Sequence, residues 1–297
     1  MKKVLLTTTL ILMLIFLAAC GSDEEASGDG GNGESGKLAE LQEAGKVTIG
    51  FANEKPYAYE EDGELKGAAV DIAAAVFKEL GIEEMDSQLA EFGQLIPGLG
   101  AGQFDVITAG MAINPDRCEN AAFGEPEMQY GEGLIVQKGN PLGLMSYKDI
   151  ADNPDATVSV MAGATENEFL KSEGVDPGQI QSAPDIPATF SAVESGRADA
   201  TTGTEMTIKM ALESAGTESL EFVDNFEQPD IDGVPSYGAA AFHKDNEDLL
   251  QAYNEKLAEL KASGKVAELL DANGFNGETN SVSDDITTEK ICSGDIK

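Results

Sequence analysis

The chain alternates short apolar runs with longer amphipathic stretches. Lys46–Phe51 and Phe104–Thr108 are apolar runs bounded by turn residues, which is typical of buried strands. Between them, the apolar residues of Ala69–Leu80 recur at helical spacing, and Gly81 stands where a helix commonly ends. A further strand near Ser87–Glu91 and a helix from about Gly93 to Leu99 complete the series. This alternation predicts an α/β fold built on a mostly parallel sheet.

A second α/β pattern begins after the predicted strand Gly133–Lys138. Its elements are the strands Thr157–Met161, Ile180–Ser182 and Asp199–Thr202 and the helices Tyr147–Ile150, Glu166–Lys171, Ile186–Ser195 and Glu205–Ser214. Gly238–Phe242 is then a predicted return strand, followed by amphipathic helices at Glu247–Ala262 and Lys265–Ala272. We therefore predict a discontinuous first lobe, 37–138 and 236–297, around an inserted second lobe, 139–235. Two unrelated consecutive domains are the alternative, but the last helices would then have no sheet to cover.

The N-terminal segment has the pattern of a secretion signal. A basic start is followed by an apolar run that is too short to cross a bilayer, and then by Leu17-Ala18-Ala19-Cys20. The last four residues resemble a bacterial lipobox, so we predict a lipoprotein signal peptide at 1–20 with Cys20 as the lipid-modified residue. An ordinary signal peptide is the alternative, although the cysteine falls at the cleavage point. Residues 21–36 are mostly Gly, Ser, Asp and Glu, which predicts a flexible acidic linker and a folded part anchored by lipid outside the membrane.

The composition argues against nucleic-acid binding and against metal- or cofactor-dependent chemistry. The chain has 54 acidic and 19 basic residues and a formal charge of −35, so its surface repels nucleic acid. A saline or alkaline habitat and an ordinary acidic extracellular protein both agree with this charge. His243 is the only histidine, and without a Cys/His cluster we expect no transition-metal site. Phosphate-loop, dinucleotide-binding and nucleophile-elbow motifs are absent from the sequence, so no cofactor is expected.

The chain has three cysteines, an odd number, and lipidation of Cys20 would leave two that can pair. Cys118 and Cys292 then remain in an oxidising exterior, where a pair normally closes. We predict that they form a disulfide, which would hold the C-terminal tail beside Cys118. Two free buried thiols are the alternative.

The stretch Gly110–Cys118 is the candidate binding loop. It follows the strand Phe104–Thr108 and a turn of small residues, so its backbone N–H groups and Arg117 can face one cleft. A turn that offers N–H groups beside a bidentate guanidinium suits a carboxylate. Pro115 fixes φ at the start of the next turn and helps to orient Arg117. The alternative is a surface arginine in a capped turn.

Motifs along most of the chain resemble one protein family. Phe104-Asp105-Val106-Ile107 followed by Gly-Met-x-Ile-x-Pro-x-Arg is similar to the ligand loop of polar-amino-acid-type periplasmic solute-binding proteins. Three segments resemble the ectoine and hydroxyectoine branch of that family: residues 52–57, 91–99 and 110–118. The resemblance implies a two-lobed, type II periplasmic-binding-protein-like fold with a two-strand hinge. It also implies a monomeric receptor that serves the permease of an ABC importer.

The resemblance also implies roles for individual residues. Arg117 and Thr165 would hold the carboxylate of the ligand, Glu54 would meet its ring N–H groups, and Tyr57 and Phe92 would enclose the ring. This set suits ectoine, whose flat, weakly hydrated amidinium fits aromatic faces and a carboxylate. Its own carboxylate suits a bidentate arginine and the start of a helix. Ordinary core packing is the alternative for either aromatic residue.

Two positions bear on the choice of ligand. Thr204 stands where binders of ordinary amino acids carry an aspartate for the ligand's ammonium, and a buried unpaired ammonium costs roughly a few kcal/mol. Ala112 stands where the ectoine branch carries an aromatic residue, which leaves the enclosure open or filled by Tyr130, Phe190 or Tyr237. The N–H of Ala112 stays available for the carboxylate.

The leading hypothesis is therefore a non-enzymatic receptor for an ectoine-like zwitterion. A receptor for a polar amino acid or another zwitterion, and a sensor for a receptor kinase, are alternatives. A dehydratase on the same fold is a further alternative, with Glu54 as its general acid. We disfavour the dehydratase because a carboxylate near Arg117 is expected to stay ionised.

Overall fold

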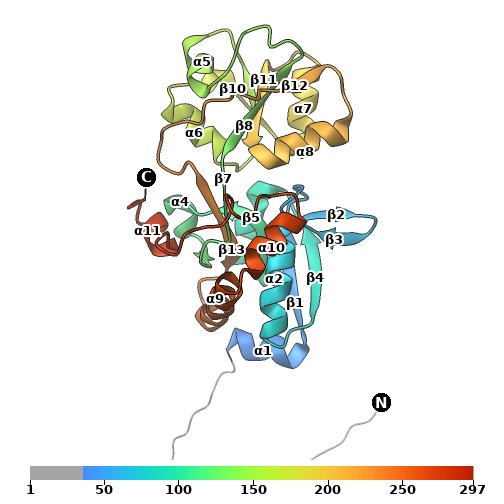
Figure 1. Cartoon of the computed structure of the whole chain (residues 1–297), viewed down its shortest axis with the longest axis vertical. Coiled ribbons are helices and arrows are strands. Elements are labelled where there is room, and N and C mark those ends of the chain that lie inside the picture. The colour runs from blue at the N-terminus through green and yellow to red at the C-terminus, as the bar shows by residue number, and fades with distance from the viewer. Residues whose placement is uncertain (1–35, 297) are drawn as a thin grey trace, which may run out of the picture. The chain divides into compact units, whose positions relative to one another are not determined.

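The computed structural model describes residues 36–296 (Figure 1). The predicted signal peptide, Cys20 and the linker up to residue 35 lie outside this range. Within 36–296 no helix combines the length and the apolar character that a membrane crossing needs.

The first sheet has the strand order β4-β1-β5-β13-β6, and β7 also pairs with β13. Its strands are β4 Glu84–Leu89, β1 Lys46–Phe51, β5 Val106–Ala112, β13 Ser236–Phe242, β6 Ala122–Phe123 and β7 Met128–Tyr130. Strand β1 runs parallel to β4 and β5, whereas β13 is antiparallel to β5, β6 and β7. The α/β class is confirmed, but the sheet is mixed because the return strand enters it in the opposite direction.

The helices that belong with this sheet come from the chain before β6 and from the chain after β13. They are α1 Lys37–Ala44, α2 Ala68–Glu79, the 3-10 turn η1 Phe92–Gln94, α3 Leu95–Gly100, α4 Pro115–Cys118, α9 Glu247–Ala262, α10 Lys265–Ala272 and α11 Thr288–Cys292. A small hairpin, β2 Tyr59–Glu61 and β3 Glu64–Lys66, turns at Asp62 and Gly63, which both have positive φ.

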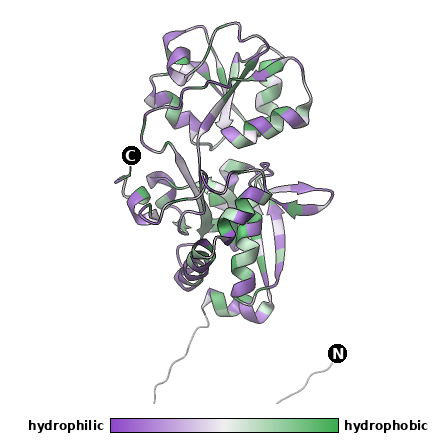
Figure 2. Ribbon diagram, in the orientation of Figure 1, coloured by the Kyte–Doolittle hydropathy of each residue, from purple (hydrophilic) through white to green (hydrophobic). Residues whose placement is uncertain are grey.

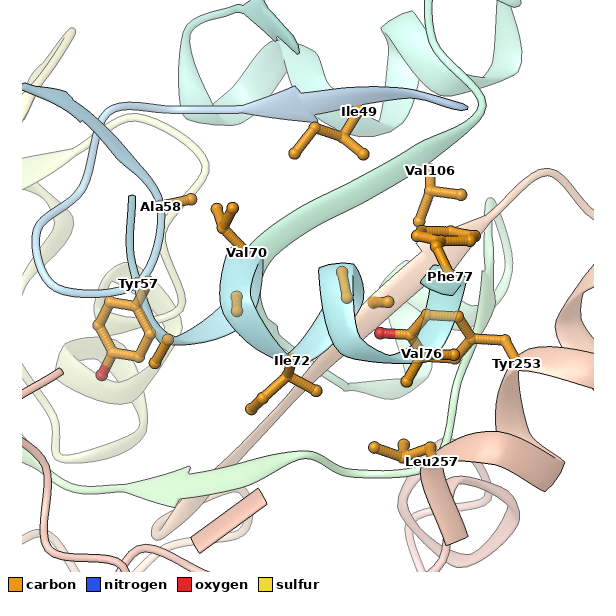
Figure 3. Packing of buried hydrophobic residues seen from close by; sticks show 14 of the residues in the cluster. Ile49, Tyr57, Ala58, Val70, Ile72, Val76, Phe77, Val106, Tyr253 and Leu257 are labelled. Carbon is orange, nitrogen blue, oxygen red and sulfur yellow. The ribbon is translucent and has the colours of Figure 1, made fainter. Parts of the chain in front are cut away.

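Helix α2 packs its apolar side into the core of this part of the chain (Figure 3). The ring of Phe77 meets that of Tyr253 from α9 edge-on at 5.5 Å, and Tyr253 meets Phe242 of β13 in the same way at 5.1 Å. Burying one such side chain contributes roughly 1.5–3 kcal/mol. In Figure 2, helix α9 is coloured mainly hydrophilic, and its buried residues are Leu249, Tyr253 and Leu257, as expected for a helix with one buried side.

The second sheet has the order β10-β9-β11-β8-β12. Its strands are β8 Glu132–Gln137, β9 Val158–Met161, β10 Ile180–Ala183, β11 Ala200–Thr204 and β12 Leu220–Phe222. The associated helices are α5 Tyr147–Asp152, α6 Glu166–Ser172, η2 Pro177–Gln179, α7 Ile186–Glu194 and α8 Glu205–Ala215. Strands β9, β10 and β11 are parallel, and β8 is antiparallel to β11 and β12.

Strand β8 corrects one predicted boundary. A first lobe that ends at residue 138 would include β8, but β8 pairs with β11 and β12 of the second sheet. The sequence prediction failed because an apolar strand can complete either neighbouring sheet. The chain crosses between the sheets at Gly131, which separates β7 from β8, and again between β12 and β13. We propose that these crossings are the two-strand hinge between a first lobe, on β1 and β5, and a second lobe, on β8 and β11.

Candidate ligand-binding site

Strand β5 and helix α4 position Arg117. Strand β5 continues through Ala112, so the predicted turn at Gly110 is part of the strand instead, held by pairing with β13. Asn114 then caps α4 by accepting the N–H of Arg117 at 2.8 Å, with Pro115 at the first helical position. This tight reversal turns the arginine side chain back toward the end of β5.

The guanidinium of Arg117 joins the two proposed lobes. Its Nη1 donates to the carbonyl of Ala112 at 2.7 Å, and its Nη2 donates to the carbonyl of Gly163 at 2.8 Å. Its central carbon lies 5.4 Å from the ring centroid of Phe92. Because a guanidinium has five N–H donors, these two bonds leave others for an anion.

A close contact between glycines brings Gly163 within reach of Arg117. A Cβ atom on Gly163 would lie 2.6 Å from Cα of Gly93, and φ of Gly163 is +82°. Neither the backbone conformation nor this spacing admits a larger residue. The contact lets the loop after β9 meet the η1 turn, which carries Phe92.

The eight residues that the sequence predicts to bind ligand line one cavity of about 30 Å³. They are Glu54, Tyr57, Phe92, Gly110, Ala112, Arg117, Thr165 and Thr204. A cavity of this size has room for about one water molecule and is too small for a solute of amino-acid size. A cleft of about 610 Å³ shares Ala112, Arg117 and Thr165 with the small cavity and therefore adjoins it.

Aromatic rings line the first-lobe side of the small cavity. Tyr57 lies between Tyr130 and Phe275, each with its ring centroid at 5.2 Å and edge-on. The hydroxyl of Tyr130 donates to the carbonyl of Gly110 at 2.6 Å. Three aromatic residues were predicted as candidates to fill the side of the enclosure that Ala112 leaves open. Of these, Tyr130 lines this cavity and Tyr237 lines the adjoining cleft.

Glu54 is a buried acidic residue that lines the small cavity. Burial, and next the charge of Glu166, raise the pKa of Glu54 to about 8, although the Thr207 hydroxyl and Arg117 favour its ionised form. The Thr207 hydroxyl donates to Glu54 Oε1 at 3.4 Å. Loss of water around the carboxylate therefore outweighs the attraction of Arg117 in setting the pKa of Glu54, which is the opposite of the direction expected from the sequence.

Two further buried carboxyl groups, those of Glu132 and Glu166, were not predicted from the sequence. Glu166 follows Thr165 at the start of α6 and lines the cavity, and Glu132 lies opposite Thr204 in the pairing of β8 with β11. Burial is the main cause that raises the pKa of both groups. Glu166 gave only the ordinary signal of an acid in the first turn of a helix.

A disulfide joins Cys118 of α4 to Cys292 of α11. Ile291 and Ile296 near this bridge line the 610 Å³ cleft together with Arg117. The tail is thus fastened beside the candidate binding loop. Over residues 36–296 the His, Cys, Asp and Glu side chains form no group arranged to hold a metal ion.

Comparison with known proteins identifies the family. The family model of bacterial extracellular solute-binding proteins, family 3, matches residues 47–274. The chain belongs to this family. A probable amino-acid ABC transporter periplasmic-binding protein of Sinorhizobium fredii, y4tE, is 37% identical over 261 residues, covering 86% of each chain.

Two other relatives are informative about ligands. The crystal structure of EhuB in complex with hydroxyectoine has a TM-score of 0.78 and 36% identity, and covers 86% of this chain and 97% of its own. The arginine-binding extracellular protein ArtP of Bacillus subtilis is 28% identical over 280 residues, covering 94% of this chain and 100% of its own. The two-lobed binding-protein fold expected from the sequence is thus confirmed.

Proposed function

We propose that this extracellular solute-binding protein captures ectoine or hydroxyectoine and delivers it to the permease of an ABC importer. The observation that carries the proposal is the convergence of Arg117, Glu54 and aromatic rings on one cavity between the proposed lobes. The likeness to EhuB supports the same class of ligand. The relative from Sinorhizobium fredii supports the transporter as partner.

The chemistry of the lining residues suits a small cyclic zwitterion. Arg117 and Thr165 would take the ligand's carboxylate, because a guanidinium fork binds both of its oxygens. Glu54 would receive N–H groups of the cationic ring, and Tyr57 and Phe92 would offer π-faces to a flat, weakly hydrated cation. Closure of the lobes would remove water from all of these contacts and present a closed surface to the permease.

A polar amino acid is the second candidate ligand. The sequence argued against it because Thr204 replaces an aspartate, and Thr204 Oγ1 is in fact engaged with Thr207 Oγ1 at 2.9 Å. Glu166, however, places a carboxyl group beside Gly203 and Thr204, so an acid is present at this end of the cavity. The likeness to ArtP favours the same alternative.

The raised pKa of Glu54 bears on the alternative that the protein is a dehydratase. Because the pKa of Glu54 is raised to about 8, this carboxyl could hold a proton at neutral pH, as a general acid requires. The family, however, is described by solute binding. We therefore retain a receptor without catalysis as the proposal, monomeric and anchored through the lipid on Cys20.

A thermal-shift screen tests the proposal. The purified protein would be heated with ectoine, hydroxyectoine, glycine betaine, arginine, glutamine and histidine. A ligand at about 100 times its Kd adds about 2.7 kcal/mol to the free energy of unfolding, which a melting curve resolves easily. Stabilisation by ectoine or hydroxyectoine alone supports the proposal, and stabilisation only by an amino acid refutes it.

A further inference from the structure

The buried carboxyl pair Glu132 and Glu166 has no role in the site as described so far. Glu132 is 1% exposed and Glu166 is 3% exposed. Both oxygens of Glu132 and Oε2 of Glu166 have no hydrogen-bond partner among the groups that residues 36–296 provide. Unpaired buried acceptors are costly, so these atoms call for a donor.

The two carboxyl groups can satisfy each other only through a proton. They interact directly, and each changes the ionisation of the other. Two carboxylates are both acceptors, whereas one protonated carboxyl can donate to its ionised neighbour. The pair is therefore expected to keep one proton until another donor reaches it.

The two carboxyl groups differ in their relation to the small cavity. Glu166 lines the small cavity, and its Oε1 lies 3.9 Å from the Cβ position of Gly203, next to Thr204. Glu132 is not among the lining residues; it lies on β8 opposite Thr204 and interacts with Glu166. The second lobe thus contributes to the cavity lining one buried carboxyl group, Glu166, whose Oε2 has no partner within residues 36–296, and places a second buried carboxyl, Glu132, against it.

Among residues 36–296, Arg117 is the one cationic side chain that acts on the ionisation of this pair. Glu54 approaches from the loop after β1, and Tyr130 and Tyr147 approach from β7 and α5. The hydroxyl of Tyr147 is already engaged with Thr202 Oγ1 at 2.6 Å. Two N–H groups of Arg117 are bonded to backbone carbonyls of both lobes, and its remaining donors are assigned to the ligand's carboxylate, so a cationic group of the ligand is the natural partner for this cluster.

We propose that Glu166 is the second lobe's specificity-determining residue for the ligand's cationic group, and that Glu132 is a positioning residue that shares a proton with Glu166 until the ligand binds. This inference rests on the proposed function as a receptor for a zwitterion, but not on which zwitterion is bound. An N–H donor of the ligand would replace the shared proton, which leaves to solvent when Glu166 binds as a carboxylate. Affinity for a cation should then rise with pH through the range in which the pair loses its proton.

Calorimetry of Glu166→Gln and Glu132→Gln separates the two roles. The probes are ectoine, hydroxyectoine and arginine, each titrated at pH 7 in phosphate and in Tris, because the difference in heat between these buffers reports proton release. Glu166→Gln should weaken the bound probe by at least tenfold. Glu132→Gln should bind within about threefold of the wild type, because its amide N–H can hold Glu166 ionised, but should release no proton. Glu213→Gln, an exposed charge change in the same lobe, should match the wild type.

The outcomes also distinguish this inference from the proposed function. If arginine binds and ectoine does not, with the same dependence on Glu166, the ligand assignment fails and this inference stands. If ectoine binds equally well to Glu166→Gln, this inference is overturned while the proposed function stands. Undiminished proton release in Glu132→Gln would also overturn it, because Glu54 would then be the source. Failure of all three probes to bind would reject both.

Discussion

Gly110 is the position at which a single added carbon should disturb the site most. Its φ is +58°, and a Cβ atom there would lie 2.3 Å from Cδ1 of Tyr57. The Tyr57 ring cannot move aside easily, because Tyr130 and Phe275 flank it with centroids at 5.2 Å. Gly110→Ala therefore strains the backbone and crowds the aromatic wall of the cavity at the same time.

The expected cost follows from these two effects. The left-handed conformation costs an alanine roughly 1–2 kcal/mol, and crowding in a packed core costs roughly 1–3 kcal/mol. The free energy of unfolding should therefore fall by about 2–5 kcal/mol, which for a chain of this size lowers Tm by about 5–15 °C. Ligand affinity should fall as well, because Tyr57 must leave its place in the cavity wall.

Gly100→Ala is the matched control. Gly100 ends helix α3, and a Cβ atom there would meet nothing within 4 Å. Alanine should leave stability unchanged or raise it by up to about 1 kcal/mol. Denaturant unfolding of the two variants without ligand gives the comparison. If Gly110→Ala unfolds at the same denaturant concentration as Gly100→Ala, the conformation and packing assigned to Gly110 are wrong.

Three further predictions test other parts of the molecule. Arg117→Lys should weaken ligand binding by more than tenfold, or about 1.4 kcal/mol, because a point charge replaces a bidentate fork; unchanged affinity by calorimetry would remove Arg117 from the site. Cys118 and Cys292 should give no free thiol when the mature protein is denatured without reductant, and two reactive thiols would contradict the disulfide. Burial raises the pKa of Glu127 to about 7, so the folded state binds its proton more tightly than the unfolded chain, and stability should fall as pH rises from about 4.5 to 7. Glu127→Gln should flatten this slope in denaturant titrations while keeping an acceptor for Tyr253, and an unaltered slope would show that Glu127 does not cause it.

The sequence predicted elements well where local patterns decide them. The bounds of β1, α9 and α10 agree with their apolar spacing and flanking residues. Strand β5 runs further than predicted because β13, distant in sequence, pairs with Met111 and Ala112. The short strand β12 was missed, since three residues of mixed character carry no periodic signal.

The residues of the candidate site also differ in whether a local sequence pattern identifies them. Residues that belong to family motifs, such as Arg117 and Glu54, were found and line one cavity. Glu132 was missed because its place depends on the register between β8 and β11, which puts it opposite Thr204. Glu166 was missed because an acid in the first turn of a helix is ordinary. A sequence with 54 acidic residues also gives no reason to single out two of them.

The central claim is that the cavity between the proposed lobes binds an ectoine-type zwitterion, and titration calorimetry with hydroxyectoine tests it most directly. The account predicts saturable binding of one molecule with a Kd in the low-micromolar range or below, about −8 kcal/mol, while arginine, glutamine and histidine give no saturable heat. Saturable binding of arginine together with no heat from ectoine or hydroxyectoine would contradict it.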